Sequence, residues 1–357
     1  MFGLNWKTFE RSGESLSAAG GGVAPGVERR PRIGLALGAG AARGWAHIGV
    51  LQELEARKIP IDVIAGASIG AVVGGCHAAG KLGDIEAFAR SLTKRRMLSL
   101  LDLSFSGAGM LAGARLRDEL SRALAGRMME DLPITFGAVA TEIGLGHEVW
   151  LRRGELVQAI RASYALPGIF EPVRVNDRWL FDGALVNPVP VTLCRAMGAE
   201  IVIAVNLIGD SAYRGALIAD AAAMSGDHKE TSAHRERHDP SAGHKDHAVE
   251  AEPPKHGSEA ARQLRRQFGR SANGAPGIAA AMLDAFNITQ DRIARSRLAG
   301  DPPDVLISAR LSKIGFFDFH RADELIALGR EAARRALNDI AEIAALENPL
   351  AGPPPAP

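Results

Sequence analysis

The chain has 357 residues, of which 46% are apolar and 23% charged, and its 42 Lys and Arg against 41 Asp and Glu leave a net charge of +1. This length allows one large or two small domains with an ample core, and the balanced charge excludes the basic surface typical of nucleic-acid-binding proteins. The two cysteines, Cys76 and Cys194, lie far apart in the sequence. Their spacing excludes a disulfide-rich scaffold and a structural zinc site.

No segment predicts export or insertion into a membrane. Residues 1–31 lack the continuous apolar stretch of a secretory signal, and the most apolar run, 63–76, is too short to cross a bilayer. A cytoplasmic protein is therefore expected, with residues 1–31 disordered. The alternative is a peripheral contact with the inner face of the membrane through four apolar side chains near the start, Phe2, Leu4, Trp6 and Phe9.

The ordered part of the chain is predicted to begin near Arg32 and to alternate strands with helices. Residues 32–38 form an apolar strand, a glycine-rich loop follows, and a helical pattern runs over 43–58. A second apolar run, 61–66, ends at a Gly-x-Ser-x-Gly turn and passes into a helix of small residues that reaches about Ala79. This order of strand, helix, strand and helix is typical of an α/β protein with a mostly parallel sheet.

The alternation continues to residue 208 and resumes near residue 275. Helices are predicted over 84–94, 114–125, 154–165, 190–197, 277–298 and 321–346. Strands are predicted over 133–142, 147–152, 200–206 and 304–309, with a short strand leading into a polar turn over 177–190. We therefore expect a catalytic domain over 32–208, with 275–346 as the C-terminal part of the same domain.

The segment between these two parts lacks the apolar residues that a core needs. Residues 225–256 contain no Leu, Ile, Phe, Met, Trp or Tyr and carry six histidines. Such a segment cannot bury enough surface to offset the entropy of ordering it, so 209–274 is predicted to be a disordered His-rich insert. Its histidines have no rigid frame for a metal ion, and no metal or other cofactor is expected. Residues 347–357 form a Pro-rich tail.

The motif Gly66-Ala67-Ser68-Ile69-Gly70 lies between a predicted strand and a predicted helix. In a nucleophile elbow, a serine on a strained turn projects above the sheet, and the flanking glycines leave room where strand and helix approach. The alternative is a glycine-rich turn with an idle serine. The strand before the motif and the helix after it favour Ser68 as a nucleophile, with Gly66 and Gly70 as the elbow glycines.

The loop after the first strand, GAGAARG over 38–44, offers consecutive backbone N–H groups at a helix start, which is a site for negative charge. A dinucleotide-binding loop is the alternative. However, Arg43 stands where the third glycine of G-x-G-x-x-G belongs, and Asp62 begins rather than ends the second strand. Beside a nucleophile elbow the loop is better explained as an oxyanion hole. Its candidate residues are Gly38, Gly40, Ala41, Arg43 and Gly44.

A serine hydrolase also needs a group that accepts the serine proton. None of the histidines outside the insert lies in a loop after a strand, where an α/β-hydrolase carries its base; they are His47, His77, His147 and His320. His47 falls within a helical pattern and is expected to be a packed helical residue. Asp182 is the alternative base, since it ends a strand-like run in a polar turn, although an Asp-Gly pair alone indicates only a turn.

Four ordered segments resemble motifs of the patatin-like phospholipase family, especially its compact bacterial members and the catalytic domain of neuropathy-target-esterase-type proteins. They are GLALGAGAARGWAHIGVL (34–51), GASIGAVVGG (66–75), AIRASYALPGIFEPV (159–173) and FDGALVNPVPV (181–191). The resemblance covers about 32–208 and resumes over about 277–335. It implies a three-layer α/β/α fold with a mostly parallel central sheet, and a Ser–Asp dyad in which Ser68 matches the nucleophile and Asp182 the acid.

The resemblance further implies a serine lipid acyl hydrolase. Its expected substrates are phospholipids, lysophospholipids or other fatty-acyl esters, and the N–H groups of Gly40 and Ala41 are the expected oxyanion donors, with Arg43 adding positive potential. Ala39 and Ala41 stand where the family commonly has glycine, and such a change keeps the donors as long as φ stays negative. The apolar residues 97–111 are expected to line an acyl pocket, to meet a membrane or to belong to the core.

Two other functions stay open from the sequence. A non-catalytic patatin-like regulatory or scaffold protein would keep the fold without turnover, and the presence of both Ser68 and Asp182 argues against it. A nucleotide-binding protein would use the loop over 38–44 for phosphate, and Arg43 together with the serine elbow argues against that. No nucleic-acid partner is expected.

Overall fold

The computed structural model describes residues 30–93, 110–124, 126–208, 277–311 and 313–347. Its strands form one mixed sheet in the order β5-β6-β3-β2-β1-β7-β8, with β4 paired to β3. Their bounds are β1 (Ile33–Leu37), β2 (Val63–Ala67), β3 (Thr135–Glu142), β4 (Glu148–Leu151), β5 (Val173–Val175), β6 (Arg178–Asp182), β7 (Ile201–Asn206) and β8 (Val305–Ser308). The central pairs are parallel, and β4, β5 and β6 join through antiparallel pairs. The predicted mostly parallel sheet is confirmed.

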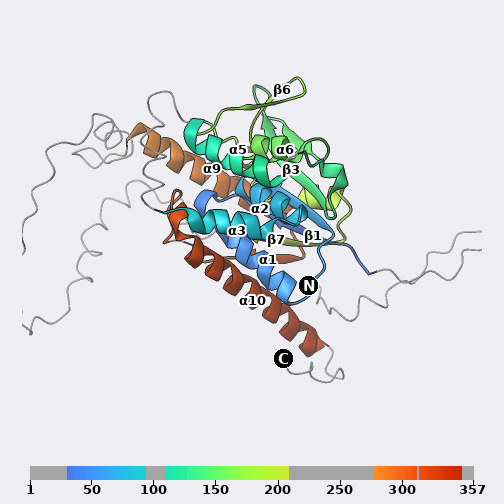
Figure 1. Cartoon of the computed structure of the whole chain (residues 1–357). Coiled ribbons are helices and arrows are strands. Elements are labelled where there is room, and N and C mark those ends of the chain that lie inside the picture. Colours follow the sequence, from blue (N-terminus) through green and yellow to red (C-terminus); the bar gives the residue numbers. More distant parts are fainter. Residues whose placement is uncertain (1–29, 94–109, 125, 209–276, 312, 348–357) are drawn as a thin grey trace, which may run out of the picture.

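Helices cover both faces of this sheet (Figure 1). The α-helices are α1 (Ala46–Ala56), α2 (Ile69–Ala78), α3 (Leu82–Ser91), α5 (Met110–Leu124), α6 (Leu156–Ser163), α7 (Val191–Ala196), α9 (Ile278–Gly300) and α10 (Ala322–Glu347). Short 3-10 turns are η2 (Ala41–Trp45), η3 (Met129–Asp131), η4 (Gly183–Leu185) and η7 (Phe319–Arg321).

The two faces of the sheet carry side chains of different size. On one face, Ile33, Leu35 and Leu37 of β1 pack into a core shared with α1, α2, α6 and α10. On the other face, Ala36 of β1 packs with Cys194 of α7 and Ala294 of α9 in a second buried cluster. Alternate strand residues point to opposite faces, so a single strand serves both cores. The expected three-layer α/β/α fold is confirmed.

The segment after residue 276 completes the same sheet. β8 pairs in parallel with β7 from Ile203 opposite Val305 to Asn206 opposite Ser308. Helix α10, drawn in red in Figure 1, lies along α1. Residues on both sides of the predicted insert therefore contribute to one core.

Nearly all the predicted elements have a counterpart displaced by a few residues. The helix predicted from Arg43 begins as the 3-10 turn η2 and becomes α-helical at Ala46. The three-residue strand β5 has no predicted counterpart, because three residues are too few to show an alternating pattern.

Several predictions concern residues that the structure does not describe. These are the disordered N-terminal segment, the apolar residues 97–111 (apart from the last two), the insert over 209–274 and the Pro-rich tail, so each stays a prediction. Among the helices that are described, none is long and apolar enough to cross a membrane.

Candidate active site

Ser68 stands on a strained turn between β2 and α2. Its backbone has φ 55° and ψ −125°, a left-handed conformation that non-glycine residues seldom adopt. The flanking glycines make the turn possible, because a Cβ at Gly66 would lie 2.5 Å from Ala71 Cα and one at Gly70 would lie 2.1 Å from the Leu37 carbonyl oxygen. The geometry is that of a nucleophile elbow, with the serine at the carboxyl end of a parallel strand.

The pairing of β3 with two different strands brings Ser68 and Asp182 together. Ala67 of β2 pairs with Val139, and Asp182 of β6 pairs with the next residue of β3, Ala140. As a result Ser68 Oγ donates a hydrogen bond of 2.6 Å to Asp182 Oδ2, across 114 residues of sequence. This distance is at the short end of the range for a hydroxyl bound to a carboxylate.

Asp182 is buried, and its environment changes its basicity. Burial raises the pKa of Asp182 to about 7, while hydrogen bonds from Ser68 Oγ and from the Ala184 N–H act in the opposite direction. An ordinary aspartate, with a pKa near 4, is a weak base at neutral pH. A carboxylate with a pKa near 7 is matched to proton transfer under neutral conditions.

Three further groups fix the positions of the two residues. Ser163 Oγ accepts a hydrogen bond of 3.0 Å from the Ser68 N–H, and Thr141 Oγ1 donates one of 2.8 Å to the Asp182 carbonyl. The Asp182 N–H donates to the Ala165 carbonyl at 2.9 Å. Sequence reasoning assigned no role to Ser163 or Ala165, although both lie in the third segment that resembles the patatin-like family.

The loop over 38–44 lies beside the elbow, since a Cβ at Gly70 would meet the Gly38 carbonyl oxygen at 2.7 Å. The N–H groups of Gly38 and Ala39 are used within the protein, at 3.0 Å from the Val205 carbonyl and 2.8 Å from the Pro188 carbonyl. Among the described residues, no acceptor binds the N–H groups of Gly40 and Ala41. These two predicted donors therefore remain available to a ligand oxygen.

Ala41 has a φ of 48°, so it does not meet the condition of a negative φ under which alanine replaces glycine without strain. A non-glycine residue held in this region costs free energy that the surrounding contacts must offset, and such residues cluster at functional sites. The strained pair Ala41 and Ser68 lies on the two turns that face each other at the carboxyl ends of β1 and β2.

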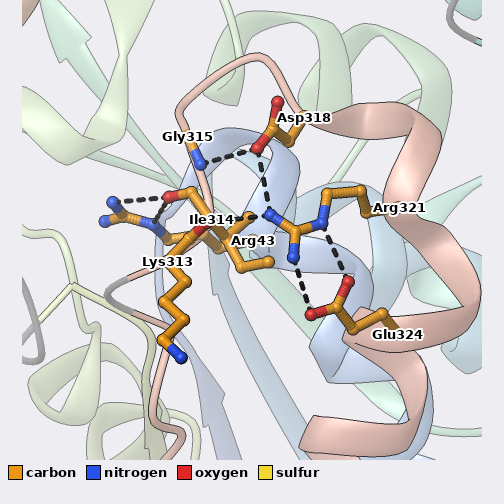
Figure 2. A network of polar contacts seen from close by, with 7 residues as sticks. All are labelled: Arg43, Lys313, Ile314, Gly315, Asp318, Arg321 and Glu324. Carbon is orange, nitrogen blue, oxygen red and sulfur yellow. Dashed lines mark hydrogen bonds and ion pairs between the residues drawn. The ribbon is translucent and has the colours of Figure 1, made fainter. Parts of the chain in front are cut away.

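Arg43 and Gly44 serve the packing of this loop. The Arg43 guanidinium donates from Nε and Nη2 to the Ile314 carbonyl at 3.1 and 3.0 Å (Figure 2). The Arg43 N–H donates to the Gly40 carbonyl, and the Ala42 N–H donates to the Phe316 carbonyl. Gly44 gives space to α2, because a Cβ there would lie 2.2 Å from side-chain atoms of Ile69. The loop is thus held by the C-terminal segment around residue 314.

His47 is completely buried on α1, as expected for a packed helical residue. Its Nε2 lies 2.7 Å from the Gly38 carbonyl oxygen, and burial lowers the pKa of His47 to about 4. The ring is therefore neutral, with its proton on Nε2. His77 and His147 lie 3.5 Å from Glu55 and Glu142. Within the described residues, no histidine binds Ser68 or Asp182, and no group of three or more potential metal ligands is found.

Comparisons with known proteins identify the family of this chain. The family model for patatin-like phospholipase matches residues 35–195. An uncharacterised NTE family protein of Mycobacterium tuberculosis is 39% identical over 86% of this chain and 91% of its own length. Two larger proteins each match 49% of this chain. Human patatin-like phospholipase domain-containing protein 6 is 32% identical over 13% of its own length. The lysophospholipase NTE1 of Mycosarcoma maydis is 37% identical over 10% of its own length. The chain belongs to the NTE family of patatin-like phospholipase proteins.

Proposed function

We propose that this protein is a serine lipid acyl hydrolase of the phospholipase A or lysophospholipase type, using a Ser68–Asp182 dyad. The observation that carries the proposal is the hydrogen bond of 2.6 Å between Ser68 Oγ and the buried Asp182 carboxylate. The family is one of lipid hydrolases, which supports a fatty-acyl ester as the substrate. A regulatory protein without turnover would not need a strained serine bound to a carboxylate of raised pKa.

The geometry supports a two-step acyl transfer. Ser68 Oγ attacks the ester carbonyl carbon while its proton passes to Asp182, and the oxyanion of the tetrahedral intermediate accepts hydrogen bonds from Gly40 and Ala41. Collapse breaks the ester C–O bond, and Asp182 returns the proton to the departing alcohol. Water then attacks the acyl-enzyme, gives a proton to Asp182 and releases the fatty acid, after which Asp182 reprotonates Ser68.

The Ser68→Ala variant tests the proposal directly. Hydrolysis of p-nitrophenyl butyrate and of lysophosphatidylcholine should fall by several orders of magnitude, while the melting temperature stays close to that of the wild type. Ser308→Ala, at an exposed serine three strands away on β8, is the matched control and should keep full activity. Wild-type protein that is folded but hydrolyses neither ester would favour the non-catalytic alternative.

A transient contact with a lipid surface forms part of the proposal. The turn after β3 and the start of β6 expose Ile143, Leu145 and Trp179 at 37%, 67% and 52%. The Ile143 N–H donates to the Trp179 carbonyl at 2.9 Å, so these side chains share one tip. Since β3 continues past its pairing with β2, the tip lies beyond the same sheet edge as Ser68. Figure 1 shows β6 at the outer end of the molecule.

Sedimentation with phosphatidylcholine vesicles tests this contact. The charges at the tip are paired, Arg174 with Asp177 and Arg178 with Glu142, so we expect binding that changes little with salt. Trp179→Ser and Leu145→Ser should reduce the bound fraction. Leu306→Ser, at a residue 44% exposed on β8 at the opposite edge of the sheet, should not. Equal binding by all variants would refute a contact at this tip.

A further inference from the structure

Three phenylalanine rings form a cluster outside the segment that the family model matches. Phe286 belongs to α9, and Phe316 and Phe317 belong to the loop between β8 and η7. The Phe286 and Phe316 ring centroids are 6.4 Å apart at 83°, and those of Phe316 and Phe317 are 5.1 Å apart at 81°. All three residues are half-buried, so each keeps part of its apolar side chain exposed.

This cluster abuts both halves of the candidate active site. Phe286 packs against a buried cluster of Ala39, Ala184 and Ile208. Ala39 precedes the proposed donor Gly40, and the Ala184 N–H binds the Asp182 carboxylate. Phe316 is tied to the oxyanion loop through its backbone, because its carbonyl accepts the Ala42 N–H at 3.1 Å. Phe286 and the backbone of Phe316 therefore connect the aromatic cluster to the segments that would surround a reacting ester.

The loop that carries Phe316 and Phe317 is braced on both sides, as Figure 2 shows. Before these residues, the Arg43 guanidinium holds the Ile314 carbonyl. After them, Asp318 accepts hydrogen bonds from the Gly315 N–H at 2.9 Å and from Arg321 at 3.4 Å. Arg321 also binds Glu324 of α10 with two donors. A braced loop presents its side chains in a fixed place, which favours a binding surface over a chance exposure.

We propose that Phe286, Phe316 and Phe317 bind the acyl chain of the substrate and set the preferred chain length. The inference rests on the proposed hydrolase function, since it assigns the apolar part of that substrate to a surface next to the dyad. Each methylene buried on the rings should raise kcat/KM by about fourfold, the equivalent of about 0.8 kcal/mol. An ester too short to reach the rings should gain nothing from them.

The test compares p-nitrophenyl butyrate with p-nitrophenyl octanoate below the micellar concentration. Phe286→Ala and Phe316→Ala should lower kcat/KM for the octanoate about tenfold and leave the butyrate within about twofold. Phe286→Leu, which keeps an apolar side chain, should restore most of the loss. Ile288→Ala is the matched control. Ile288 is 40% exposed and follows Phe286 by two residues on α9, which places it on the other side of that helix.

The outcomes separate this inference from the proposed function. Loss confined to the octanoate, with the melting temperatures unchanged, would support an acyl-binding surface. An equal loss on both esters, or an unchanged octanoate rate in both alanine variants, would overturn it while leaving the hydrolase intact. Wild-type protein that hydrolyses neither ester would overturn the proposed function, and this inference with it.

Discussion

At the scale of single residues, the site combines a buried acid with two strained turns. Asp182 is 1% exposed, and Ser68 and Ala41 both have positive φ. Burial away from water disfavours the ionised form of a carboxyl group, and the proposed mechanism needs that ionised form. We therefore expect the site to lower the free energy of unfolding. The largest part of this loss should come from the ionised carboxylate of Asp182 at alkaline pH.

The Asp182→Asn variant should be inactive and yet more stable than the wild type at pH 8. The folded-state pKa of about 7 exceeds the unfolded value near 4, so the stability contributed by protonated Asp182 is fully present below pH 4 and is lost as the pH rises through 7. Thermal melting at pH 5 and pH 8 checks this. The advantage of the variant should be clear at pH 8 and small at pH 5, and the wild-type rate should rise through one ionisation near pH 7.

Loss of proton acceptance in Asp182→Asn should reduce the hydrolysis rate by a factor on the order of 10² or more. The asparagine can still accept the Ala184 N–H, so the turn should persist. A variant within a few-fold of the wild-type rate would mean that Asp182 only caps the turn of η4.

We expect His47 to stabilise the loop over 38–44 and to take no part in proton transfer from Ser68. Its neutral ring donates to the Gly38 carbonyl, and its removal would leave that buried oxygen unpaired at a cost of about 1–3 kcal/mol. His47→Ala should lower both the melting temperature and kcat, with the pH dependence of the remaining activity unchanged. His77, His147 and His320 should be replaceable with most activity kept. A shifted pH profile in His47→Ala would identify it as the base instead.

At the scale of elements, the packing of α1 on α10 depends on close backbone contact. A Cβ at Gly329 of α10 would lie 1.9 Å from the Ala46 carbonyl oxygen, and one at Gly49 of α1 would lie 1.9 Å from the Ile326 carbonyl oxygen. Each helix thus places a glycine against the backbone of the other. This contact joins α10 to the helix that follows the loop over 38–44.

Gly329→Ala should destabilise the protein by about 1–3 kcal/mol, because the added methyl group forces two helix backbones apart. Gly83→Ala in α3 is the control, since a Cβ there would meet nothing within 4 Å and alanine favours a helix. Denaturant titration of both variants measures the difference. If Gly329→Ala proved as stable as Gly83→Ala, the close approach of α1 and α10 would be refuted.

The elements differ in how far the sequence could predict them. The strands β1 and β2 are short apolar runs that each lead into a glycine-rich turn. This pattern is local, and it predicts the ends of both strands within two residues. The role of Asp182 could not follow from its Asp-Gly turn, because it depends on the register of β6 against β3. The aromatic cluster was not predicted either, since Phe286 and Phe316 meet only through tertiary packing.

At the scale of the whole molecule, one sheet unites segments that are far apart in sequence. β8 pairs with β7 from the far side of residues 209–276, and the loop around residue 314 holds Arg43. The part of the chain after residue 276 therefore contributes both to the core and to the bonding of the loop over 38–44. A chain that stopped at residue 208 would expose the face of α1 that contacts α10.

Two deletions test this division of the chain. Removal of 225–256, which contain no large apolar residue, should leave the melting temperature and butyrate hydrolysis nearly unchanged, because loop length affects stability only slowly. Truncation after residue 208 should abolish cooperative unfolding. A large fall in melting temperature on removal of 225–256 would show that this segment packs on the rest.

The most direct test of the dyad is labelling with a fluorophosphonate, followed by mass-spectrometric mapping of the modified peptide. The reagent phosphonylates a serine only when that serine is activated as a nucleophile. We predict one label per chain, on Ser68, with slow or no labelling of Asp182→Asn at neutral pH. A label on another residue, or labelling of Asp182→Asn at the wild-type rate, would contradict the Ser68–Asp182 dyad.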